Sequence, residues 1–303
     1  MTATALFLIL SSAILHAAWN LIGKQGRMTL PLVAFLATAG AVASAWVFFV
    51  TPVSFAKATP AFYAALGGMA AGQILWGAAL CRSYQAFDLS AAYPMVNALP
   101  LPLLACVTAL GGFGKPLSTS AWCGAAAIFA GCLLAPMGTF ADSRPSRFPW
   151  RGLPFVLTAS AGTVIYTLCD SEAQRCLRAT LDPGTSETAL SLAYYAIRSA
   201  VLAPAMWLAV ASGRRTRAEA VDLWRNGIRH ALAASVCAVL SYPLVLLAMN
   251  FVTNVSYVQA FRQTGLLFGT VGGIAFLHER CTAPKLIGVA LILAGLAAML
   301  FPA

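Results

Sequence analysis

Charged residues and histidines are scarce in this sequence. Asp, Glu, Lys and Arg together make up 9% of its 303 residues, whereas a soluble domain carries about 25%. The nine acidic residues and three histidines fall mostly between apolar runs, so they form no recognisable metal cluster, paired-carboxylate site or nucleophile–base set. These shortages exclude an ordinary soluble domain and weigh against an enzyme.

The cysteines do not follow a metal-binding or disulfide pattern. Eight are present, mostly within apolar runs, and none forms a CxxC pair. We therefore expect them to serve as small core side chains, and the sequence predicts no metal or other cofactor.

A nucleic-acid partner is not expected, although the formal net charge is +10. The basic residues are scattered through short connectors, and no basic helix with interleaved aromatic residues occurs. An uneven distribution of Lys and Arg between connectors is typical of membrane topology. The predicted partner is therefore the lipid bilayer, with the chain as a multi-pass protein of the cell (inner or plasma) membrane.

Long apolar runs dominate what the sequence does contain, since 60% of its residues are hydrophobic. A helix needs about 20 residues to cross the hydrocarbon core of a bilayer, and ten runs have this length. Charged connectors such as "SGRRTRAEAVDLWRNG" (212–227) separate them. The sequence therefore predicts an all-α integral membrane protein with ten transmembrane helices. The runs are 4–23, 30–51, 60–82, 89–110, 118–136, 152–170, 187–211, 228–250, 253–277 and 284–301.

The two halves of the chain resemble each other. A shift of 164 residues places Gly124 on Gly288 and Gly131 on Gly295 without a gap. Each repeat would hold five helices, and an odd number of crossings inverts the second copy in the membrane, as in many secondary transporters. We therefore predict two inverted five-helix repeats. They occupy residues 1–136 and 152–303, with a connector at 137–151.

A family resemblance becomes visible in three segments. The ending "LHERCTAPKLIGVALILAGL" (277–296) resembles that of EamA-type members of the drug/metabolite transporter superfamily, as do "HAAWNLIGK" (16–24) and "AFRQTGLLFGTVGGIAFL". The resemblance covers essentially the whole chain as two EamA repeats. It implies ten helices around a central cavity and the export or exchange of small metabolites. One departure is "FGKPLS", with Lys115 where the first repeat usually has an acid.

Polar side chains share one face of the first run. His16, Asn20 and Lys24 are spaced by four residues, with Trp19 beside them. Polar groups facing lipid are costly, so this face is expected to line a wet cavity or a polar helix contact. Lys24 could instead extend to the headgroups, and His16 could be either a packing residue or a proton site.

The ninth run contains an arginine far from either end. Gln259, Arg262 and Gln263 share one face, and a charge at this depth suggests a functional site. A guanidinium suits carboxylate or phosphate groups. The alternative is a structural ion pair, with Asp170 or Glu279 as the available acid.

Further candidates come from prolines, amides and aromatic residues in other runs. Three prolines between 94 and 102 predict a bent fourth helix, which would either line the cavity or only pack. Asp170 falls at the predicted end of the sixth run, where it could be either a solvated residue or part of the site. Aromatic residues near helix ends, such as Tyr194 and Tyr195, are more typical of an interfacial belt. The additional substrate-binding candidates are Gln73, Trp76, Tyr93, Asn97 and Tyr166.

Together these features favour a secondary transporter, an exporter or exchanger that works by alternating access. The basic, amide and aromatic candidates suit a small anionic or zwitterionic metabolite, such as an amino or organic acid. Facilitated diffusion and coupling to protons both stay open, as do a monomer and a weak dimer. The alternative function is an integral-membrane enzyme acting on a lipid-borne substrate.

Overall fold

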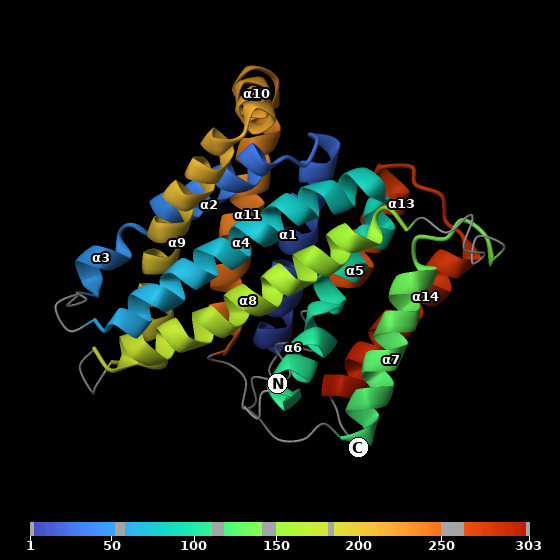
Figure 1. Ribbon diagram of the computed structural model, residues 1–303, viewed down its shortest axis with the longest axis horizontal. Helices are drawn as coiled ribbons and strands as arrows, with labels where there is room; N and C mark the ends of the chain where they lie inside the picture. Colours follow the sequence, from blue (N-terminus) through green and yellow to red (C-terminus); the bar gives the residue numbers. More distant parts are fainter. Residues whose placement is uncertain are drawn as a thin grey trace.

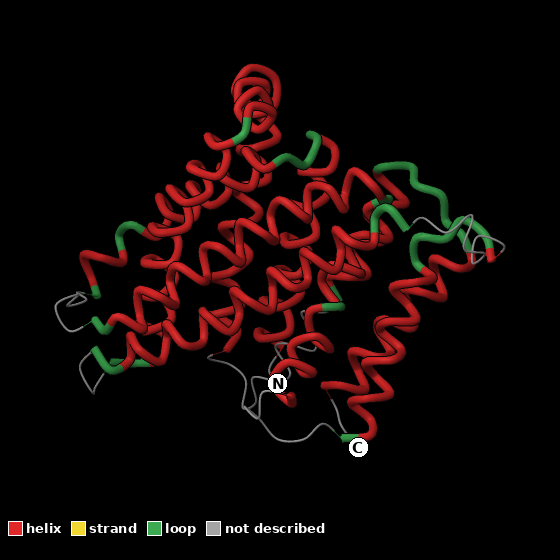
Figure 2. Tube along the Cα trace, in the orientation of Figure 1, coloured by secondary structure: helices red, strands yellow, loops and turns green. Residues whose placement is uncertain are grey.

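The computed structural model describes residues 3–51, 58–110, 118–140, 150–180, 185–249 and 264–300. These ranges are almost entirely helical and contain no strand (Figures 1 and 2). Each predicted run coincides, over its described part, with one or two helices. The helices are α1 (Ala3–Gln25), α2 (Leu30–Ser44), α3 (Val47–Val50), α4 (Pro60–Ala86), α5 (Leu89–Ala98), α6 (Pro100–Leu110), α7 (Thr119–Leu134), α8 (Leu153–Arg178), α9 (Glu187–Ser212), α10 (Arg214–Asp222), the π-helix η3 (Leu223–Gly227), α11 (Ile228–Met249), α13 (Gly265–Phe276) and α14 (Ala283–Leu300).

The helices present apolar surfaces outward, which fits a membrane protein. Six helical spans in the described ranges are long and apolar enough to cross a bilayer. Phe49, Val42 and Leu208 are 87%, 72% and 72% exposed, as expected for side chains that face lipid. The chain is therefore a helical membrane protein. The six spans are Leu6–Gln25, Leu30–Val50, Pro60–Ala86, Leu89–Val107, Leu153–Arg178 and Thr188–Ser212.

Hydroxyl side chains fix where several of these helices begin. The first N–H groups of a helix lack partners within it, and a Ser or Thr oxygen at the N-cap accepts from one of them. Thr59 accepts from Phe62 N–H at 3.3 Å, and Pro60 follows it in the first turn of α4. Ser118 and Ser186 cap α7 and α9 in the same way, each at 3.2 Å. These caps explain the sharp starts of three long helices.

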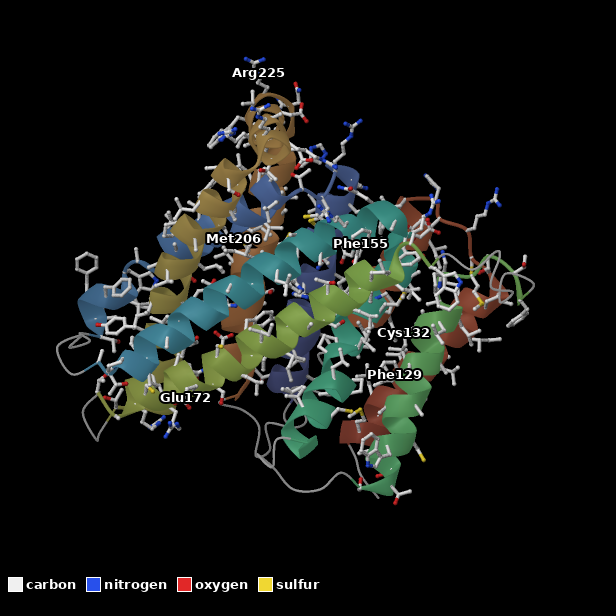
Figure 3. The ribbon with its side chains drawn as sticks, viewed as in Figure 1. Phe129, Cys132, Phe155, Glu172, Met206 and Arg225 are labelled. Atoms are coloured by element: carbon white, nitrogen blue, oxygen red, sulfur yellow. The ribbon has the colours of Figure 1, made fainter. Side chains whose placement is uncertain are left out.

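Two boundaries differ from the sequence prediction. The helix α8 continues to Arg178 rather than ending at 170, and its last turns are held by an Arg175–Glu172 ion pair of 2.6 Å. The connector at 212–227 is also helical, because its Arg, Ala and Glu residues favour helix even without an apolar face. Both errors arose because apolar length was used as the measure of a helix. In Figure 3 this polar segment, with Arg225, projects beyond the apolar helices.

Long helices pack in pairs. The helix α4 runs along α8, α1 along α11, α2 along α9, and α7 along α14 (Figure 1). Glycines allow the closest approaches: a Cβ added at Gly72 would lie 3.0 Å from the carbonyl oxygen of Gly162 on the facing helix. Pairing of small residues brings helix backbones together where lipid supplies no hydrophobic driving force. The α4–α8 pair forms one wall of the cavity described next.

Candidate functional site: a polar cavity between the helices

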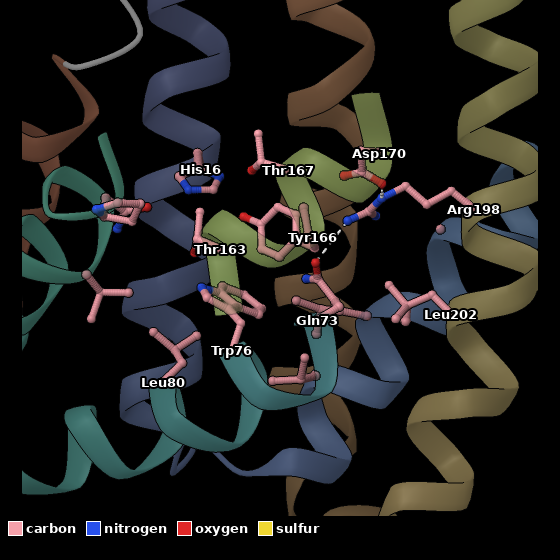
Figure 4. Close-up of a pocket in the computed structure, with 18 of the residues that line it drawn as sticks. His16, Gln73, Trp76, Leu80, Thr163, Tyr166, Thr167, Asp170, Arg198 and Leu202 are labelled. Carbon is pink, nitrogen blue, oxygen red and sulfur yellow. Dashed lines mark hydrogen bonds and ion pairs between the residues drawn. The ribbon is translucent and has the colours of Figure 1, made fainter. Parts of the chain in front are cut away.

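A cavity of about 750 Å³ lies among helices from both halves of the chain. Its lining residues come from α1, α2, α4, α5, α6, α8, α9, α11 and α13, and Figure 4 shows part of this wall. Its volume suits a small metabolite, since ligand pockets measure roughly 300–1,000 Å³. Eight of the predicted residues line it together: His16, Trp19, Asn20, Gln73, Trp76, Tyr93, Asn97 and Tyr166.

Four predicted residues are not part of this described lining. Lys24 lies at the end of α1, and its ammonium donates to the carbonyl oxygens of Tyr84 and, at 2.9 Å, Phe87. It therefore satisfies the last carbonyls of α4, a role that the sequence pattern did not suggest. The remaining three, Gln259, Arg262 and Gln263, fall outside the described residues.

An ion pair forms one wall of the cavity. Asp170 of α8 lies 3.2 Å from the Nε of Arg198 on α9, and each side chain is 19% exposed. The hydroxyl of Tyr194 also donates to Asp170. Arg198 donates a second bond from Nη2 to the Oε1 of Gln73, at 2.9 Å, and its Cζ lies 5.8 Å from the centre of the Tyr166 ring (Figure 4). Three side chains from α4 and α8 thus fix the position of one guanidinium, and Tyr194 of α9 in turn holds Asp170.

The position of Asp170 corrects the predicted end of the sixth run. The run is predicted to end at residue 170, but α8 continues for two more turns and keeps Asp170 beside the cavity. Arg198 was not among the predicted site residues. It lies eleven residues inside α9, so the depth argument applied to Arg262 would have identified it equally well.

Histidine and tryptophan meet on the opposite wall, formed by α1. The indole Nε1 of Trp19 donates to the Nδ1 of His16 at 3.2 Å, and their rings meet edge to face at 5.6 Å. The ring of Tyr93 lies 6.2 Å from that of His16. In this contact the indole is the donor and Nδ1 is the acceptor, which fixes the orientation of the imidazole ring. His16 is therefore a positioned side chain in the cavity wall.

The two asparagines support the cavity through hydrogen bonds to backbone and side-chain atoms. Asn20 is 2% exposed; its amide donates to His16 O at 2.8 Å, and its Oδ1 accepts from the hydroxyl of Tyr84 at 2.7 Å. Asn97 donates to the carbonyl of Tyr93, also at 2.8 Å. Asn20 thereby joins α1 to α4 at the edge of the cavity.

The fourth run is interrupted at its prolines. Helix α5 ends at Ala98 and α6 begins at Pro100, which lacks an N–H and cannot continue the hydrogen-bond ladder. Pro100, Leu101 and Leu104 all line the cavity. The broken helix is therefore placed where irregular backbone is tolerated in a membrane, beside a cavity.

No metal site is evident in the described part of the chain, where His, Cys, Asp and Glu side chains do not gather in groups of three or more. The charged cavity groups are instead positioned for ion pairing and hydrogen bonding. The arrangement can hold a small charged molecule between a guanidinium, a carboxylate and aromatic walls.

Comparison with known proteins establishes the fold alone. No family model and no curated protein matches the sequence. Eleven chains of solved structures are similar. One of them, described only as the crystal structure of a protein, aligns over 99% of this chain and 98% of its own length, with a TM-score of 0.54 and 15% identity. The chain thus shares its whole fold with a solved structure, and the fold and site together define a helical membrane protein with a polar internal cavity.

Proposed function

We propose that this chain is a secondary transporter of small anionic or zwitterionic metabolites, such as amino or organic acids, and that it works by alternating access. The observation that carries the proposal is the polar cavity within apolar helices. A charged side chain at the centre of a bilayer costs about 2.5–3.5 kcal/mol on insertion scales. Asp170 and Arg198 lie within membrane-spanning segments and face the cavity. Such charges are typical of substrate pathways.

Reciprocal contacts between α7 and α14 support two inverted repeats. The register that matches Gly124 with Gly288 also matches Gly131 with Gly295. A Cβ added at Gly124 would lie 2.6 Å from the carbonyl oxygen of Gly295, and one at Gly131 would lie 2.5 Å from that of Gly288. Gly124 therefore contacts the equivalent of Gly131, and Gly131 contacts the equivalent of Gly124. An interface around a two-fold axis requires this reciprocity.

The other helix pairs show the same two-fold relationship, in which each contact is equivalent to another contact or to itself. In two five-helix repeats, α1 corresponds to α8 and α4 to α11. The packing of α1 on α11 is then the counterpart of the packing of α8 on α4, while α2–α9 and α7–α14 are self-related pairs. This pattern supports ten transmembrane helices with a cavity at the interface of the repeats, where transporters of this plan bind substrate.

The resemblance to EamA-type transporters adds direction and location to the proposal. It suggests export or exchange across the inner or plasma membrane. The ending that carries the resemblance, 277–296, includes Glu279 and Lys285, which contact the start of α5. The motif therefore belongs to a contact between the two proposed repeats.

A stabilisation screen tests the proposal and can identify the class of substrate at the same time. Purified protein in detergent is heated with members of a library of small organic acids, amino acids, amines and sugars. We expect anionic or zwitterionic members to raise the melting temperature, because a ligand bound only to the folded state stabilises it. Stabilisation confined to lipid-like compounds, with their chemical conversion, would instead favour the membrane enzyme.

A further inference from the structure

The charges of the cavity wall come as an adjacent pair of opposite sign. Asp170 and Arg198 are the acid and the base among the described cavity residues, apart from His16. Their contact through Nε measures 3.2 Å, and both side chains keep 19% of their surface exposed. The pair is therefore partly buried but still reachable from the cavity.

We infer, on the basis of the proposed function, that this pair recognises a zwitterion whose ammonium and carboxylate groups lie close together, as in an amino acid. Arg198 binds the carboxylate of the substrate, and Asp170 binds its ammonium. The substrate thus enters as a second ion pair beside the one built into the wall, and Asp170 is the specificity-determining residue.

Charge balance favours a zwitterion over an ion of one sign. A simple anion would pair with Arg198, but the nearby carboxylate of Asp170 would repel it. A simple cation would pair with Asp170, but the guanidinium of Arg198 would repel it. Within a partly buried pair these penalties are large, because charges left without compensation in a low-dielectric site are strongly unfavourable. A zwitterion compensates both groups and leaves the net charge of the site unchanged.

Arg198 has donors left for a carboxylate. Its described hydrogen bonds, to Asp170 and Gln73, use Nε and Nη2. A guanidinium offers five N–H donors in a planar fork, so a substrate carboxylate can be held by two parallel bonds. The Tyr166 ring below the guanidinium and the Gln73 amide keep the fork oriented. Both are positioning residues.

Hydrogen bonds to one carboxylate oxygen hold Asp170 in place, and its other oxygen can still accept a bond from a ligand. Oδ1 accepts both bonds described for this carboxylate, from Tyr194 and from Arg198. A carboxylate has two oxygens with about four acceptor positions. Oδ2 can therefore accept an ammonium while Oδ1 keeps its protein contacts. The built-in pair need not break when the substrate binds.

Matched ligands test the inference on the wild-type protein. The set comprises leucine, 4-methylpentanoate (which lacks the amino group) and 3-methylbutylamine (which lacks the carboxylate), with the equivalent trios built on alanine and phenylalanine. Binding is measured by calorimetry or by melting-temperature shift in detergent. For at least one trio we expect the zwitterion to bind roughly 10- to 100-fold more tightly than either partial analogue, because each lost group forfeits a charged hydrogen bond. Equal binding of the zwitterion and its anion would overturn the inference.

Two variants test whether Asp170 is responsible for the preference for a zwitterion. Asp170→Asn should weaken zwitterion binding roughly 10-fold or more and remove the preference over the matched anion. The control is Glu172→Gln on the same helix, an acid that pairs with exposed Arg175 and is absent from the cavity lining; it should change neither quantity. An unchanged preference in Asp170→Asn contradicts the assignment. If this variant does not fold, the wild-type comparison still decides.

These binding data, together with flux and product analysis in liposomes, separate this inference from the proposed function. Binding and flux of organic acids without any zwitterion preference would refute the role of Asp170 and leave the transporter standing. Absence of binding and flux for all three ligand classes would refute the zwitterion inference. Chemical conversion of a lipid in the absence of flux would refute the transporter itself.

Discussion

Glu279 accepts hydrogen bonds from the backbone N–H groups of Leu89 and Ser90, at 2.6 and 2.8 Å. These N–H groups open α5 and have no partner within the helix, and a carboxylate at this end also interacts favourably with the helix dipole. A Cβ at Gly273 would lie 2.5 Å from the Glu279 carboxylate, so glycine leaves room for it. The turn before α14 is thereby fixed to the start of α5.

Two lysines hold the same α4–α5 corner, residues 84–90. Lys285 donates to Asp88 Oδ2 at 2.9 Å and to Ser90 Oγ at 2.8 Å. Lys24 donates to carbonyl oxygens on the other side of the corner. The first and last helices of the chain thus meet at one short connection.

Removing the carboxylate of Glu279 should destabilise the corner. We expect Glu279→Ala to lower the free energy of unfolding by about 1–3 kcal/mol, because two N–H groups lose their acceptor. Glu279→Gln should lose less, since one amide oxygen remains to accept a bond. Melting temperatures in detergent measure both. Arg280→Ala, at the exposed neighbouring position, is the control, and equal stabilities of Glu279→Ala and Arg280→Ala would disprove the role of this cap.

The Lys285–Asp88 pair should respond unequally to loss of its two members. Lys285 is 4% exposed in its side chain, whereas that of Asp88 is 54% exposed. Lys285→Ala should cost about 1–3 kcal/mol, since it removes the donor to two acceptors. Asp88→Asn should cost less, because the asparagine oxygen can still accept from Lys285 and the side chain at position 88 is largely exposed. If both variants lose similar amounts of unfolding free energy, Lys285 does not contribute more to stability than Asp88.

Alanine in place of the paired glycines should separate α7 from α14. At Gly131 and Gly288 the added Cβ would meet a facing carbonyl oxygen at 2.5 and 2.7 Å. Overpacking of this kind costs about 1–3 kcal/mol. Gly67→Ala is the matched control, because nothing lies within 4 Å of its Cβ, and alanine there should stabilise the helix by up to about 1 kcal/mol. The prediction fails if all three variants melt alike.

The distribution of positive charge predicts the orientation in the membrane. Helix α1 begins and α14 ends at one end of the molecule, and the basic segment α10 lies at the opposite end (Figure 1). Connectors with many Lys and Arg residues stay in the cytoplasm, so both termini should lie outside. A phosphatase fused after Ala303, active only outside, should report activity. A cytoplasmic fluorescent reporter that is bright at this position would reverse the assignment.

Helical spacing was sufficient to predict the cavity-facing side of α1 and α4. His16, Trp19 and Asn20 all line the cavity, as do Gln73 and Trp76. Polar side chains at these intervals share a face, and in a membrane that face has to turn away from lipid. The interruption before Pro100 was predictable for a local reason too, since proline removes a backbone donor.

Contacts between distant parts of the chain could not be predicted in this way. Lys24 appeared to belong with His16, but its partners are the last carbonyls of α4, some sixty residues away. Glu279 appeared to be a simple turn residue, and its partners lie 189 and 190 residues away. Periodicity along one helix shows which side chains share a face, but not which part of another helix those side chains contact. The Asp170–Arg198 pair was missed for this reason too.

Counterflow in liposomes tests whether the protein carries a small charged metabolite across a membrane without changing it. Vesicles with the purified protein are loaded with an unlabelled ligand from the stabilisation screen and diluted into its radiolabelled form. We expect transient accumulation of intact label, strongly reduced in Arg198→Ala and retained in Glu172→Gln. Label that never exceeds the level in protein-free vesicles, or that is recovered as a different compound, would contradict it.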